Sequence, residues 1–133
     1  MQVLYGLDAQ GLWPEERELR RVLTQHLVLL EQVNTTAHEF ALELLQGVVA
    51  HRERIDRMLE QASHNWRVER MSRVDRNVLR LAVFELGSLA VPAAVVLDEA
   101  IEIARLLGST ESSGFVNGVL GRVQELLKVR PLM

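Results

Sequence analysis

Apolar side chains recur along most of this chain every three or four residues, the spacing of one face of an α-helix. Residues 1–9 carry this pattern, and it resumes after Pro14, a residue type favoured in the first turn of a helix. An alternation of apolar and polar residues, which would indicate strands, is not evident. The pattern predicts an all-α fold.

The middle of the chain carries two further helical patterns. Residues 34–62 hold either one long helix or two helices broken near residues 47–51. After a polar connector at residues 63–66, the clearest helical segment covers residues 74–86 and ends at Gly87.

Proline and glycine mark the ends of the later helices. Pro92 begins one helix and Gly108 ends it. Ser109 or Ser112 caps a last helix that reaches about Lys128. Together these segments predict a bundle of six to seven helices with short connections.

The last helix has an unusual sequence, "ESSGFVNGVLGRV" over residues 111–123. Its valines and leucines form a stripe to be buried, while Gly114, Gly118 and Gly121 collect on a neighbouring side. Each interior glycine costs a helix roughly 0.5–1 kcal/mol relative to alanine. Either another helix or an RNA backbone approaches this side closely. Phe115 near the helix N-terminus either closes the core or stacks on an unpaired base.

Charge is distributed unevenly along the 133 residues, whose net charge is −3. Residues 52–80 hold eight arginines against five acids, a local excess of +3, so the rest of the chain sums to −6. Arg73, Arg76 and Arg80 share one side of their predicted helix. They form either a solvated face paired with acids such as Asp75 or a ridge that contacts phosphate, so Arg76 and Arg80 are candidate RNA-binding residues.

The residues for catalysis or metal binding are missing from the sequence. There is no cysteine, no serine in a nucleophile elbow and no glycine-rich phosphate loop. The four histidines lie twelve to thirteen residues apart, which is not the spacing of a metal site on one helix. We therefore expect neither an enzyme nor a metal or cofactor. No secretory signal or membrane-spanning run is evident, so we expect a cytoplasmic protein.

Three blocks of sequence follow one another between residues 73 and 120: "RVDRNVLRLAVFEL", "VPAAVVLDEAIEIARLLG" and "SSGFVNGVL". In this order they closely resemble the C-terminal half of the NusB family, bacterial transcription antitermination factors. The opening "QVLYGLD" resembles that family's first helix from its midpoint onward. The resemblance implies one compact domain over residues 1–133, with about seven helices in two packed subdomains, residues 1–63 and 64–133.

The resemblance also implies a function and a set of contact residues. Members of the family bind single-stranded boxA RNA together with the ribosomal protein NusE, in complexes that keep RNA polymerase elongating through ribosomal RNA operons. This chain would therefore be a non-enzymatic RNA-binding adaptor. The positions that match the NusE surface are Tyr5 and Asp75. Those that match residues near RNA are Gln2, Glu111, Ser113, Phe115 and Asn117, and Arg80 matches an arginine shared by its helix in the family.

Two departures from the family bear on RNA affinity. An arginine-rich segment precedes the family's first helix and this sequence begins after it, so we expect a shortened N-terminus. Gly114 stands where relatives commonly carry a lysine. Both changes remove positive charge from the same predicted edge, which predicts weak RNA binding by the protein alone.

Two other functions stay open at this point. One is a helical protein-interaction module that has lost RNA binding, and the other is a detached accessory domain of an RNA methyltransferase. The sequence also leaves open whether the free protein is a monomer or a dimer.

Overall fold

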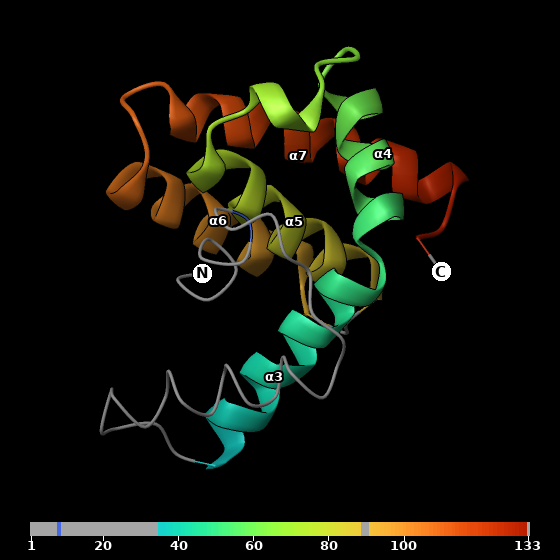
Figure 1. Ribbon diagram of the computed structural model, residues 1–133, viewed down its shortest axis with the longest axis vertical. Helices are drawn as coiled ribbons and strands as arrows, with labels where there is room; N and C mark the ends of the chain where they lie inside the picture. The colour runs from blue at the N-terminus through green and yellow to red at the C-terminus, as the bar shows by residue number, and fades with distance from the viewer. Residues whose placement is uncertain (1–7, 9–34, 89–90, 133) are drawn as a thin grey trace.

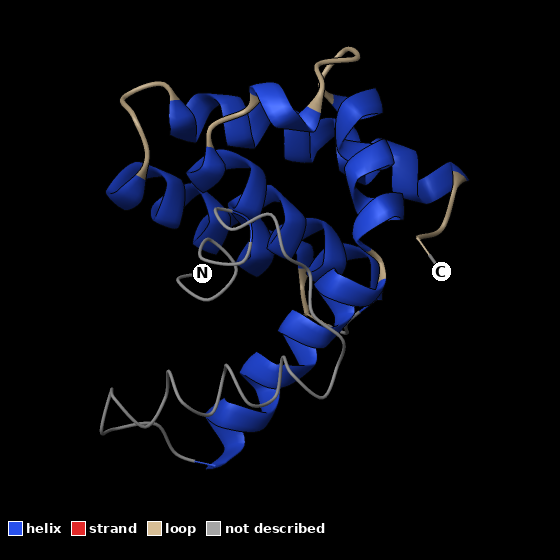
Figure 2. Ribbon diagram, in the orientation of Figure 1, coloured by secondary structure: helices blue, strands red, loops and turns tan. Residues whose placement is uncertain are grey.

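The computed structural model describes Asp8, residues 35–88 and residues 91–132 (Figure 1). Within them lie α3 (Thr35–Ala50), α4 (Arg52–Ala62), the short 3₁₀-helix η1 (Val68–Arg70), α5 (Arg73–Ser88), α6 (Ala93–Leu107) and α7 (Ser112–Val129). Figure 2 shows helices joined by loops and no strand in this part of the chain. The all-α prediction is confirmed.

The predicted number of six to seven helices exceeds the five α-helices of the described residues. The helices predicted over residues 1–9 and after Pro14 lie outside those residues, apart from Asp8. The choice left open for residues 34–62 is resolved in favour of two helices, because α3 ends and α4 begins on either side of His51.

Helix α5 lies at the centre of the described fold, where it packs against α3, α4, α6 and α7 (Figure 1). Its Leu79 and Val83 are completely buried. The stripe predicted for the last helix is buried against it, formed by Val116, Val119, Leu120 and Val123. Since α7 also packs on α4 and α6, its orientation is fixed from three sides.

One glycine is required where α3 crosses α5. A Cβ atom at Gly47 would overlap the ring of Phe84, so only glycine allows the two helices to come this close. The ring of His51 stacks on the same Phe84 with 6.0 Å between centroids, and its Nδ1 lies 3.0 Å from the Gly47 carbonyl oxygen. Gly47 is thus explained by packing.

None of the helices in the described ranges is long and apolar enough to cross a membrane.

Candidate functional site

The N-terminal turn of α7 is positioned by the loop that leads into it. Ser112 is buried, and its Oγ accepts a hydrogen bond of 2.9 Å from the backbone N–H of Ser109. The residue before the helix, Glu111, provides no side-chain cap. The predicted cap is therefore wrong in detail, because the Ser112 hydroxyl stabilises the preceding loop instead. The first amide groups of a helix have no acceptor within it, so this end of α7 favours anions.

Two aromatic rings meet beside this turn. Phe115, the fourth residue of α7, is half-buried and packs against the core. The ring of Trp66 lies 6.2 Å from that of Phe115 between centroids and is tilted by 44°. Trp66 is 57% exposed. The pair thus anchors one ring in the core and presents the other to solvent.

The loop between α4 and η1 holds Trp66 in place. His64 and Asn65 have φ values of 57° and 66°, in the left-handed region, so the chain reverses sharply after α4. The Trp66 N–H donates to the Ser63 carbonyl at 3.3 Å, and the Ser63 hydroxyl donates to the Trp66 carbonyl at 3.2 Å. Glu60 also accepts the Val68 N–H through its carboxylate at 3.0 Å. Trp66 is therefore exposed but its backbone is well fixed.

The glycines of α7 are not required by packing. A Cβ atom at Gly114 or Gly121 would meet no atom within 4 Å, and one at Gly118 would meet only the guanidinium tip of Arg122, at 3.9 Å. The interpretation in which another helix of this chain packs on the glycine side is thus excluded for the described residues. The glycine side of α7 is therefore open, whereas Gly47 lies in the tight crossing of α3 and α5.

The structure brings together the predicted RNA-contact residues on α7. Glu111 and Asn117 are exposed, while Ser113 and Phe115 are half-buried in the same first turns. Together with Trp66 and the three glycines they form a surface that we call the α7 edge. Gln2 and Tyr5, predicted for RNA and NusE, lie outside the described residues.

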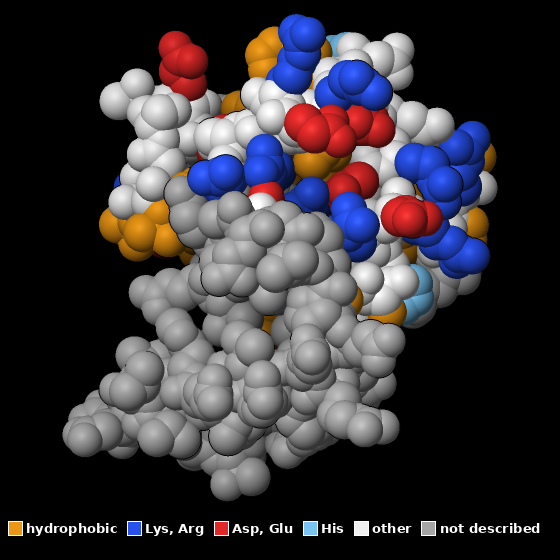
Figure 3. All heavy atoms as spheres, viewed as in Figure 1, with side chains coloured by type: hydrophobic (Ala, Val, Ile, Leu, Met, Phe, Trp, Pro, Cys, Tyr) orange, Lys and Arg blue, Asp and Glu red, His pale blue; other side chains and the backbone are white. Residues whose placement is uncertain are grey.

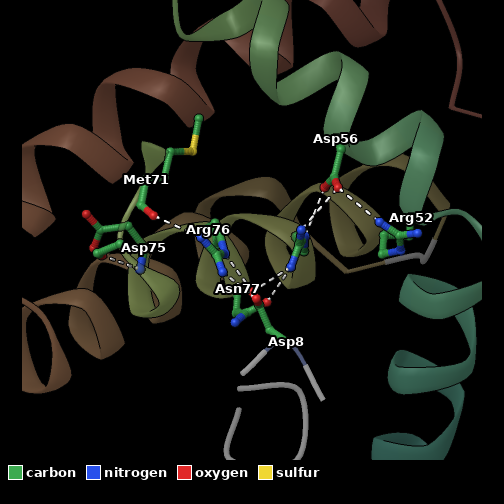
Figure 4. A network of polar contacts seen from close by, with 9 residues as sticks. Asp8, Arg52, Asp56, Met71, Asp75, Arg76 and Asn77 are labelled. Carbon is green, nitrogen blue, oxygen red and sulfur yellow. Dashed lines mark hydrogen bonds and ion pairs between the residues drawn. The ribbon is translucent and has the colours of Figure 1, made fainter. Parts of the chain in front are cut away.

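Arg80 does not belong to an exposed ridge, so that prediction is wrong. Its side chain is only 5% exposed and donates to both carboxylate oxygens of Asp56, at 2.9 and 3.1 Å. Its NH1 atom also donates to Asp8 and to Asn77, each at 2.8 Å (Figure 4). A guanidinium held by two carboxylates and an amide is a structural group, and phosphate cannot reach it without breaking the fold.

Arg76 completes the same network. Its Nε donates to Asp8 at 2.6 Å, its NH2 group donates to the other oxygen of Asp8, and its NH1 group donates to the Met71 carbonyl at 3.2 Å. Burial alone would raise the pKa of Asp8, but the hydrogen bond from Arg76 and the charges of Arg80 and Arg76 hold that pKa below its ordinary value. Arg76 is thus committed to Asp8 rather than to an external phosphate.

Asp75, predicted to contact NusE, is 9% exposed in the free chain. Its backbone N–H donates to the Ser72 hydroxyl at 3.1 Å, which caps α5. Its Oδ1 atom is buried and has no hydrogen-bond donor among the described residues. Such an oxygen is costly to leave unpaired, so Asp75 is a position where an incoming donor would be stabilising.

Two features of this region are not evident from the sequence pattern. Trp66 falls in the predicted polar connector, although an aromatic residue among polar ones is a signal for a special role. Asp8 and Asp56 have no evident connection with Arg80, because they are 72 and 24 residues away from it in the sequence. In the described part of the chain, no group of three or more histidine, aspartate or glutamate side chains could hold a metal ion.

Comparison with known proteins gives a consistent family. The sequence matches the profile of the NusB family over residues 1–125. The transcription antitermination protein NusB of Myxococcus xanthus is 53% identical over 88 residues, 65% of this chain and 63% of that protein. That of Anaeromyxobacter dehalogenans is 42% identical over 123 residues, 92% of this chain and 83% of that protein.

The similarity to the NusB family extends to the three-dimensional fold. The chain resembles one from a crystal structure of the antitermination factors NusB and NusE in complex with dsRNA, with a TM-score of 0.77 and 29% identity. The match covers 93% of this chain and 89% of that one. On the family profile, these relatives and the shared fold, the chain belongs to the NusB family.

Proposed function

We propose that this protein is a non-enzymatic RNA-binding adaptor that acts with NusE in transcription antitermination and binds boxA-type single-stranded RNA. The observation that carries the proposal is the open α7 edge, where three glycines pack against no other described helix and Trp66 and Phe115 lie side by side. Relatives named as transcription antitermination proteins support the class of function.

The α7 edge offers the three kinds of contact that single-stranded RNA uses. Trp66 and Phe115 provide aromatic faces for unpaired bases. The side at Gly114 and Gly118 lets a sugar–phosphate backbone approach the helix closely. The exposed amide of Asn117 can donate to and accept from a base edge. The N-terminus of α7 adds a favourable field for phosphate.

The NusE part of the proposal rests on a different helix. Asp75 lies in the first turn of α5, with a buried oxygen that lacks a donor among the described residues. Because that oxygen is buried, a donor from NusE would reach it only through a local rearrangement of this turn, and would then link the two proteins. The structural neighbour that contains NusE supports this partner class.

The direct test is RNA binding measured by fluorescence anisotropy with labelled single-stranded boxA RNA, in the absence and presence of purified NusE. We expect binding that NusE strengthens, because two weak surfaces then act together. A double-stranded RNA of the same length serves as the competitor that tests strand preference. The proposal is refuted if boxA RNA does not bind at micromolar concentrations, either alone or in the presence of NusE.

The second candidate is a protein-interaction module without RNA binding. It is favoured by the commitment of Arg76 and Arg80 to internal carboxylates, which removes two cations from the predicted phosphate ridge. It predicts a NusE complex with weak salt dependence, formed by a protein with no affinity for boxA RNA. The affinities for boxA RNA and for NusE, measured at salt concentrations from about 50 to about 200 mM, separate the two candidates. Contacts to phosphate weaken strongly over this range.

A further inference from the structure

A concave surface separate from the α7 edge lies between α4 and the segment that follows α7. It is a cavity of about 260 Å³ lined by Arg54, Arg57, Met58, Gln61, Arg130, Pro131 and Leu132. Met58 and Leu132 are buried and form an apolar floor. The three charged residues that line it are all arginines, and no carboxylate is among them.

These arginines are not neutralised within the described part of the chain. Arg54 donates to the Leu132 carbonyl at 3.3 Å, and Arg130 donates to the Gln61 side-chain oxygen at 3.3 Å. Both acceptors are uncharged. Arg57 makes no hydrogen bond or ion pair with any described residue and is exposed. The cavity thus presents three full positive charges, in contrast to the α5 network.

A second hollow adjoins the cavity and shares two of its arginines, while its own Arg52 is paired with Asp56. This hollow, of about 500 Å³, shares Arg54 and Arg57 and adds His51, Arg52 and the single acid Glu53. Figure 3 shows lysine and arginine side chains gathered at the right-hand border of the molecule, over α4. Two adjacent hollows that share a row of guanidinium groups suit a chain of phosphates better than one small anion.

A further arginine lies between the α7 edge and the cavity. Arg122 is exposed, and its Nε donates to the carbonyl of Ala62 at the end of α4, so it bridges α7 and α4. Its guanidinium also lies beside Gly118 of the α7 edge. From Phe115 to Arg130 the distance along α7 is about 22 Å at the rise of an α-helix, which a few nucleotides can span.

We propose that the arginine cavity is a second phosphate-binding site, which holds the backbone of the RNA strand that continues from the α7 edge past Arg122. The site rests on the proposed function, since it takes flanking nucleotides of the same RNA. Guanidinium groups bind phosphate in a bidentate manner, and the apolar floor accommodates a sugar or base. This site would replace part of the positive charge that Gly114 and the paired α5 arginines do not supply.

The test compares two labelled single strands, the boxA element alone and the same element with about ten nucleotides on each side, a total length above the site size of a single-strand-binding domain. Wild-type protein should bind the flanked RNA more tightly and with a steeper dependence on salt. Arg57→Glu should abolish this gain, reducing the affinity for flanked RNA about fivefold or more and flattening the logarithmic salt slope by about 0.7 for each phosphate that the variant no longer neutralises. It should leave binding of the short RNA unchanged.

Arg105→Glu is the matched control, because it makes the same change of charge at an exposed arginine of α6 that pairs with Glu102. It should keep the gain from the flanks, and circular dichroism should show both variants folded. The site is overturned if the Arg57→Glu protein still binds flanked RNA more tightly than short RNA, or if it binds both RNAs equally more weakly than wild type. It is also overturned if Arg105→Glu has the same effect as Arg57→Glu, or if the flanking nucleotides do not increase the affinity of the wild-type protein. If the wild-type protein binds the short RNA and the flanks add nothing, the proposed function survives. If it binds neither RNA, even in the presence of NusE, both the site and the proposed function fail.

Discussion

The arginines of α5 and those around the end of α4 are the same residue type in opposite circumstances. Arg80 is buried and held by Asp56 and Asp8, whereas Arg57 is exposed and has no partner among the described residues. The difference is made by two carboxylates, Asp56 of α4 and Asp8, which the fold places against Arg80 and not against Arg57. A local excess of arginine in the sequence therefore indicates a phosphate-binding surface only where the fold places no carboxylate against those arginines.

The first and largest effect should come from removing the guanidinium of Arg80. Arg80→Met keeps an apolar stem of similar length but, among the described residues, leaves Asp56 with only Arg52, at 3.8 Å, and Asp8 with only Arg76 as a counter-charge. Breaking a buried pair in this way costs about 3–5 kcal/mol of the free energy of unfolding. Urea denaturation followed by circular dichroism measures the loss. Arg57→Met should change stability by less than about 0.5 kcal/mol, and equal losses in the two variants would contradict the comparison.

The second effect concerns the aromatic contacts that we propose for RNA. Trp66→Ala should weaken boxA RNA binding by about 1–3 kcal/mol, the usual value of one stacked base. Phe115→Ala should do the same, but it also removes core packing, so Phe115→Leu is the variant that keeps the apolar contact. Anisotropy titrations give the affinities, and melting curves give the stabilities. A Trp66→Ala protein that binds as wild type would remove the stacking role of the exposed ring.

The third effect distinguishes glycines that serve packing from those that serve a ligand. Gly121→Ala should stabilise the fold by about 0.5–1 kcal/mol, because its Cβ meets open space. The same variant should weaken RNA binding if the backbone comes close there. Gly47→Ala is the matched comparison and should destabilise, because its Cβ overlaps Phe84. Thermal unfolding of both variants tests this, and destabilisation by Gly121→Ala would show that the side is not open.

The smallest effect is on the pH dependence of stability. The pKa of Asp8 is lower in the folded chain than in the unfolded one, so its contribution is complete above a pH of about 4 and is lost as the pH falls further. The pKa of Glu85 is raised, mainly by burial and to a smaller extent by the negative charge of Glu99. The folded chain therefore takes up this proton more readily than the unfolded one, and the fold gains stability as the pH falls towards about 4.3.

Melting temperatures measured between neutral and strongly acidic pH separate these two groups. Asp8→Asn should show a shallower loss of stability in the acid range than wild type. Glu85→Gln should lack the gain in stability that comes from protonation of Glu85, which occurs at a higher pH than the loss at Asp8. A profile of Asp8→Asn that is parallel to that of wild type below the ordinary pKa of aspartate would contradict the role of the network.

Local signals in the sequence predict the local parts of the structure. Pro92 and Gly108 mark the two ends of α6 correctly, α5 runs one residue past the predicted end at Gly87, and the valine stripe of α7 is buried as its periodicity requires. The prediction of an exposed arginine ridge is wrong because the two acids that pair with Arg80 lie far away from it in the sequence. The place of Trp66 beside Phe115 is not evident from the sequence because it follows two consecutive left-handed residues, which no periodicity reveals.

The most direct test of the α7 edge is a ¹H–¹⁵N correlation spectrum of the full chain recorded during titration with boxA RNA. We predict that the backbone amide signals of Gly114, Asn117 and Gly118 and the indole N–H signal of Trp66 shift together and saturate at the affinity found by anisotropy. If RNA binds with that affinity while these four signals stay in place, the α7 edge is not the RNA interface.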